Sequence, residues 1–164
     1  MVVASLKSGL KSDAVRELQT LLTEIAGDDT VGVLIIAGDF GGTGAANGEM
    51  NSLCEEVENF RRPVIAAITG AAQGAGFELA LACDLRVAAE TSRFGFPGAG
   101  GGPAVRLAKM VGKARAKHMA LTGQIIDALE AERLGLLSHV AAEAEVVAMA
   151  RKLARAVASR ASRK

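Results

Sequence analysis

Residues 63–90 read PVIAAITGAAQGAGFELALACDLRVAAE and decide the fold of this chain. An apolar, β-branched run containing Ile65 and Ile68 leads into a glycine-rich turn, and a helix-like segment with one carboxylate, Glu78, follows. A short apolar strand over 85–87 ends the stretch. Strand, glycine turn, helix and strand in this order predict a βαβ unit. Because free N–H groups and the helix dipole favour negative charge at a helix N-terminus, the acid one turn further indicates chemistry beside an oxyanion.

The flanking segments alternate between helical and strand patterns, which predicts an α/β layered fold with parallel pairing. Ser52 and Glu55 have capping-box spacing and predict a helix start at Ser52, and Asp127 is expected to be an N-cap. Helices are expected over 14–25, 52–60, 104–111, 114–121, 128–134 and about 142–161, and further strands over 31–37 and 136–140. Residues 1–164 contain no internal repeat or linker and are expected to form one domain.

Composition limits the class of protein. Half of the 164 residues are hydrophobic, yet the chain has no Trp or Tyr and only five Phe, so the core must consist mainly of Ala, Leu, Val and Ile. The formal net charge of +1 gives no reason to expect a nucleic-acid partner. Cys54 and Cys83 lack metal-ligand spacing and are expected to be small core residues of a reduced, cytoplasmic chain, with no metal bound.

The sequence does not match the signal peptides, membrane spans or nucleotide-binding loops that apolar or glycine-rich segments commonly form. Residues 1–11 lack an apolar core long enough for a signal peptide. Residues 63–83 are apolar, but their glycines, Gln73 and Glu78 argue against a membrane span, so no membrane partner is expected. The turn has neither the G-x-G-x-x-G spacing of dinucleotide sites nor the Gly-Lys-Ser/Thr of a P-loop. Asp84 is expected to be structural, and His118 and His139 each stand alone.

Together these segments resemble the enoyl-CoA hydratase/isomerase (crotonase) family over roughly 15–140. The densest part is 63–97, which ends in AETSRFGFP, while VGVLIIAGD (31–39) is similar to the strand before the family's first oxyanion loop. The resemblance implies a crotonase-like (ClpP/crotonase) spiral of ββα units, truncated here, with a parallel sheet and surrounding helices. It also implies chemistry on an acyl-CoA thioester, whose enolate oxygen two backbone N–H groups stabilise, with no cofactor besides the coenzyme A of the substrate.

The resemblance assigns roles to single residues of two loops. Glu78 matches one of the two acids of the hydratases, and Ala75 stands where the family's second oxyanion loop has a donor glycine. In the first oxyanion loop, Gly42 is the nearest match to the donor, with Thr43 as the alternative. The residues expected to contact the substrate are Phe40, Thr43, Gly74 and Gly76.

Departures from the family pattern alter these expectations. Phe94-Gly95-Phe96-Pro97 runs directly into Gly98, so the segment with the second acid is deleted. The strands that open the family fold also look absent before the first helix. With one acid, isomerisation or another enolate reaction fits better than hydration. The alternative, from another class, is a non-catalytic acyl-CoA-binding or scaffolding protein.

Two expectations concern the C-terminal part of the chain. The family builds trimers and pairs of trimers, and the apolar residues of 134–157 favour a homo-oligomer here as well. The end of the chain is basic, with Arg151, Arg155 and Arg160 among its residues. A solvated helix end is the simpler interpretation, and contact with a CoA phosphate or an acidic partner is the alternative.

Overall fold

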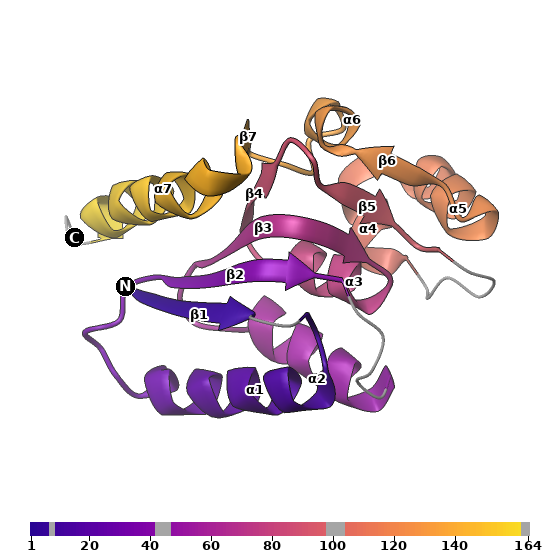
Figure 1. Cartoon of the computed structure of the whole chain (residues 1–164). Helices are drawn as coiled ribbons and strands as arrows, with labels where there is room; N and C mark the ends of the chain where they lie inside the picture. Colours follow the sequence, from indigo (N-terminus) through magenta and orange to yellow (C-terminus); the bar gives the residue numbers. More distant parts are fainter. Residues whose placement is uncertain (7–8, 42–46, 98–103, 162–164) are drawn as a thin grey trace.

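The computed structural model describes residues 1–6, 9–41, 47–97 and 104–161. Within them, seven strands form one sheet with the path β1-β2-β3-β4-β7, and β5 and β6 branch from β3 (Figure 1). The pairs along the main path are all parallel, and β5 and β6 are antiparallel. The strands are β1 (Val2–Leu6), β2 (Leu34–Phe40), β3 (Val64–Gln73), β4 (Leu85–Ala89), β5 (Arg93–Gly95), β6 (Ile125–Asp127) and β7 (His139–Ala141).

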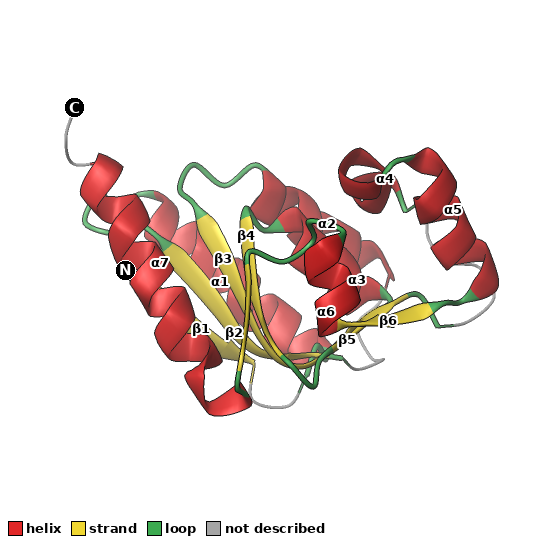
Figure 2. Cartoon of the chain, turned by 90° about the horizontal axis from the view of Figure 1, so that it is seen from above, coloured by secondary structure: helices red, strands yellow, loops and turns green. Residues whose placement is uncertain are grey.

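Helices cover both faces of this sheet, which explains why its central strands are apolar throughout. The first three helices lie on one face and α7 lies on the other (Figures 1 and 2). The helices are α1 (Ser12–Ala26), α2 (Asn47–Glu58), α3 (Ala75–Ala82), α4 (Val105–Val111), α5 (Lys113–Thr122), α6 (Ala128–Arg133) and α7 (Val146–Ala161), with a 3-10 turn, η1 (Glu143–Glu145), before α7.

Side chains of the sheet alternate between two hydrophobic cores, because successive residues of a strand point to opposite faces. Leu34, Ile36 and Ile68 belong to the larger core beneath α1, α2 and α3. Ile35 and Ile65 belong to the smaller core against α7, which contributes its own buried residues. Those residues are Val146, Ala150 and Ala154. The βαβ unit predicted from residues 63–90 is confirmed as β3, α3 and β4.

Three expectations for the N-terminal half are wrong. An opening strand does exist, because residues 2–6 form β1 and pair in parallel with β2; β1 lies at the sheet edge and is only partly buried, so its pattern is weak. Helix α2 begins at Asn47 and not at Ser52, whose hydroxyl donates to Glu56 at 3.0 Å inside the helix. Strand β2 runs to Phe40, three residues beyond its expected end.

Two further local expectations hold, whereas the strand expected over 136–140 forms at His139–Ala141 and the helix expected from about 142 begins at Val146, after η1. Asp127 is the N-cap of α6 and accepts a hydrogen bond from the Glu130 N–H at 2.8 Å. Asp84 has the structural role expected of it, because its carboxylate accepts from the Val64 N–H at 2.7 Å and joins β3 to the end of α3. Within the described residues, no helix is both long and apolar enough to cross a membrane.

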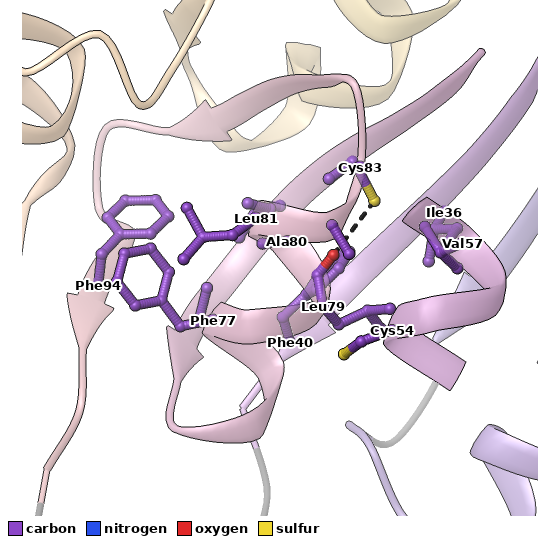
Figure 3. Packing of buried hydrophobic residues seen from close by; sticks show 14 of the residues in the cluster. Ile36, Phe40, Cys54, Val57, Phe77, Leu79, Ala80, Leu81, Cys83 and Phe94 are labelled. Carbon is purple, nitrogen blue, oxygen red and sulfur yellow. Dashed lines mark hydrogen bonds between the residues drawn. The ribbon is translucent and has the colours of Figure 1, made fainter. Parts of the chain in front are cut away.

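The two cysteines are buried residues of the larger core, as expected (Figure 3). The Cys83 thiol contacts the Leu79 carbonyl oxygen at 3.4 Å. Burial raises the pKa of Cys54 and of Cys83 to about 12. Both thiols therefore stay protonated at neutral pH and are poor nucleophiles there.

Candidate functional site

The end of β2 and the first turn of α3 touch through their backbones. A Cβ atom placed on Gly76 would lie 1.5 Å from the Phe40 carbonyl oxygen and 2.7 Å from its carbonyl carbon. Only glycine fits at position 76, because the Phe40 carbonyl is part of the main chain and cannot move aside as a side chain could. The close approach places the end of β2 beside the N-terminus of α3.

Gly74 turns the chain from β3 into α3. Its φ of 56° and ψ of −123° suit glycine, and its N–H donates to the Gly95 oxygen at 2.9 Å. The Gly74 carbonyl accepts from the N–H groups of Phe77 and Glu78 at 3.1 and 3.2 Å. The turn is therefore fixed on both sides, by β5 and by the first turn of α3.

Ala75 follows this turn as the first residue of α3. Its φ is negative, so a Cβ is tolerated where the family pattern has glycine. Its N–H has no hydrogen-bond acceptor among the described residues, as the geometry of a helix N-terminus dictates. An exposed donor at the positive end of the helix is suited to a developing oxyanion.

The first expected loop is fixed where it leaves the sheet. The Gly41 N–H donates to the Asp39 carboxylate at 2.8 Å, and the Gly41 oxygen accepts from the Leu10 N–H at 3.0 Å. Gly42 and Thr43, the expected donor and its alternative, lie outside the described residues. The expected substrate contact at Phe40 is wrong, because the residue is fully buried: its side chain packs in the larger core (Figure 3) and its carbonyl lies against Gly76.

Glu78 lies one turn into α3 with its side chain 18% exposed. Its Oε2 atom accepts a hydrogen bond from Arg106 Nη1 at 3.2 Å. Its Oε1 atom is buried and has no hydrogen-bond partner among the residues the structure describes. A buried carboxylate oxygen without a partner lowers stability and is typical of a group kept for function.

Arg106 was not among the residues the sequence indicated. It extends from α4 and joins Glu78 to Glu58, whose Oε2 atom lies 2.9 Å from Arg106 Nη2. Lys109 also contacts Glu58 at 3.4 Å. Partial burial tends to raise the pKa of Glu58, but the hydrogen bonds and charges of Arg106 and Lys109 lower it overall. No motif marks this arrangement, because Arg106 stands 28 residues after Glu78.

The segment 94–97, after which the family pattern has its second acid, is apolar. Phe94 and Phe96 are buried and pack against Phe77, with ring centroids 5.9 and 5.2 Å apart. Gly95 pairs with Gln73 at the end of β3. The FGFP segment therefore closes one side of the α3 turn with aromatic rings and supplies no carboxylate.

A separate hollow of about 320 Å³ lies between α5 and α6. It is lined by Arg115, His118, Gln124 and Glu130, and Arg115 pairs with Glu130 across it at 3.0 Å. It contains none of the residues that the sequence analysis expected to form the site. His118 is exposed there, and the α3 turn remains the candidate site.

Comparison with known proteins finds similar proteins that share one family description. The family model described as enoyl-CoA hydratase/isomerase matches residues 42–164. A probable enoyl-CoA hydratase of Rhizobium meliloti (strain 1021) is 38% identical over 93% of this chain and 67% of its own length. The short-chain-enoyl-CoA hydratase of Clostridium acetobutylicum is 31% identical over 94% and 68%. The chain spans about two thirds, or less, of the length of the curated relatives it matches.

Solved structures with a similar fold include an enoyl-CoA hydratase and an enoyl CoA isomerase. The enoyl-CoA hydratase from Bacillus anthracis superposes with a TM-score of 0.86 at 32% identity, over 96% of this chain and 73% of that one. A monofunctional enoyl CoA isomerase from M. smegmatis gives 0.84 at 30% identity, over 95% and 79%. Both a hydratase and an isomerase are thus similar to this chain over nearly its whole length.

Proposed function

Because this chain belongs to the enoyl-CoA hydratase/isomerase (crotonase) family and has the fold of its solved members, we propose that it acts on an acyl-CoA thioester through an enolate. The observation that carries the proposal is the first turn of α3. There the Ala75 N–H and Oε1 of Glu78, both without a hydrogen-bond partner among the described residues, lie within one helical turn. These are a donor for an oxyanion and an acceptor for a proton.

In the proposed reaction, the thioester oxygen accepts from the Ala75 N–H and from an N–H of the first loop, near Gly42 or Thr43. Gly74 and Gly76 shape the turn on which the thioester lies, and the buried Phe40 supports that turn from the core. Each oxyanion donor contributes on the order of 3 kcal/mol to the stability of the transition state. The α3 dipole adds to this effect because the charge develops at its N-terminus.

Glu78 is the group that moves the proton. Its carboxylate takes a proton from C2 of a 3-enoyl thioester, and the electron pair of that C–H bond becomes the enolate, conjugated with the 3,4 double bond. Return of the proton to C4 gives the 2-enoyl thioester. One carboxylate suffices for this isomerisation, whereas hydration also needs a group that activates water.

We expect the purified chain to isomerise a short 3-enoyl-CoA at least about 10-fold faster than it hydrates crotonyl-CoA, because one acid serves the first reaction better. Product formation is followed by absorbance and mass spectrometry, and binding of acetyl-CoA by calorimetry. Hydration equal to isomerisation would contradict the single-acid mechanism. Binding without either reaction would favour the non-catalytic acyl-CoA-binding alternative.

We also propose that the chain associates with itself. Helix α7 buries its apolar side against the sheet, so the C-terminal residues do not supply the exposed surface expected of them. Large apolar side chains are instead exposed on and beside α4, α5 and α6, at Val105, Leu121 and Leu129. Light scattering at micromolar concentration is expected to give a multiple of the 16.8 kDa chain mass. A monomer mass would contradict the proposal.

A further inference from the structure

Three helices meet at one guanidinium group beside the candidate base. Arg106, on the first turn of α4, lies 3.2 Å from Glu78 of α3 and 2.9 Å from Glu58 of α2. Its side chain is only 20% exposed. We propose that Arg106 is a positioning residue that holds Oε2 of Glu78 and thereby presents Oε1 to the substrate; this inference rests on the proposed function.

The two oxygens of Glu78 are in different surroundings. Oε2 accepts the hydrogen bond from Arg106, while Oε1 is buried and unpaired among the described residues. A carboxylate held at one oxygen by a guanidinium has little freedom to rotate, so the other oxygen has a defined direction. Proton transfer depends on such alignment, and misplacing a catalytic group by about 1 Å lowers rates by roughly 100-fold.

Arg106 is itself held in place. Its Nε and Nη2 atoms both contact Oε2 of Glu58, at 3.1 and 2.9 Å, and this leaves Nη1 for Glu78. Lys109 lies 3.4 Å from the other oxygen of Glu58. The residue that precedes α4, Ala104, has a left-handed conformation with φ 41°, an unusual one for a residue with a side chain. The ion pairs with Glu58 and Glu78 therefore hold the Arg106 guanidinium at the start of α4.

The central test is Arg106→Met, which keeps the length of the side chain and removes its charge and donors. We expect kcat for 3-enoyl-CoA isomerisation to fall about 10- to 100-fold. The Kd for acetyl-CoA, measured by calorimetry, is expected to stay within about threefold, because a positioning residue does not touch the ligand. Arg106→Lys keeps a cation and is expected to recover part of the lost kcat.

Two further variants separate positioning from general damage. Glu58→Gln leaves both Glu78 and Arg106 in place but weakens the support of the guanidinium, so kcat is expected to fall less than in Arg106→Met. Arg115→Met, which removes an ion pair to Glu130 on α5 and α6, is the matched control and is expected to keep wild-type kcat. Circular dichroism confirms folding of each variant.

The outcomes distinguish the positioning role of Arg106 from the proposed function of the chain. Wild-type kcat in folded Arg106→Met would overturn the positioning role and leave the proposed function intact. A fall in kcat equal in Arg115→Met and Arg106→Met would also overturn it. A wild-type chain that turns over neither thioester would overturn the proposed function and, with it, the role of Arg106.

Discussion

Replacing Glu78 with glutamine is expected to lower kcat for 3-enoyl-CoA isomerisation by roughly 10²- to 10⁴-fold. The amide has nearly the same shape and keeps an oxygen that accepts from Arg106, but it does not take up the C2 proton. The first measurement is the initial rate at saturating substrate. The second is exchange of the C2 protons with deuterium in D2O, followed by NMR, which reports proton removal even where no product forms.

The matched control is Glu90→Gln, the same chemical change at an exposed residue just after β4. We expect Glu90→Gln to keep the wild-type rate and exchange. Thermal unfolding of both variants separates loss of the base from loss of the fold. If Glu78→Gln retains more than about a tenth of wild-type activity, Glu78 is not the base, because general-base catalysis contributes at least about 100-fold.

Replacing Gly76 with alanine is expected to have the largest effect on stability. The added Cβ would lie 1.5 Å from the Phe40 carbonyl oxygen, so β2 and α3 must move apart. We expect the free energy of unfolding to fall by about 4 kcal/mol or more, which is a larger loss than most single substitutions cause. Urea denaturation followed by circular dichroism measures this loss, and a failure to fold is the extreme form of the same result.

Gly48→Ala is the control for this substitution. Gly48 lies in α2, and a Cβ there would meet no atom of the described residues within 4 Å. Alanine is expected to stabilise the helix by up to about 1 kcal/mol, because it favours helical backbone more than glycine does. A Gly76→Ala chain within 1 kcal/mol of wild type would show that α3 does not contact β2 in the described way.

Residues 63–90 specified β3, α3 and β4 by themselves. The apolar run, the glycine turn and the helical segment each act over a few neighbouring residues, so their patterns are visible in the sequence. The Asp127 cap is local in the same sense, because its hydrogen bond spans three residues. The position of Glu78 one turn into the helix follows from the same stretch, and so does the position of Ala75 at its start.

Several weak or short elements were not predicted from the sequence. Strands β5 and β6 have three residues each, too few for a period of two to be recognised. Strand β1 is recognisable mainly through its pairing with β2, which joins residue 2 to residue 34. The start of α2 was misplaced because Ser52 and Glu55 have capping spacing in the middle of a helix that begins at Asn47.

Only the tertiary structure decided how the candidate base is held. The sequence by itself determined a helix with Glu78 on its first turn, because hydrophobic period and turn chemistry are local properties. The ion pairs of Arg106 with Glu78 and Glu58 join residues 28 and 48 positions apart. Such contacts depend on how three helices pack, and packing is set by the volumes and backbone approaches of the whole core. The contact between Gly76 and Phe40 has the same origin, since it exists only where β2 and α3 meet.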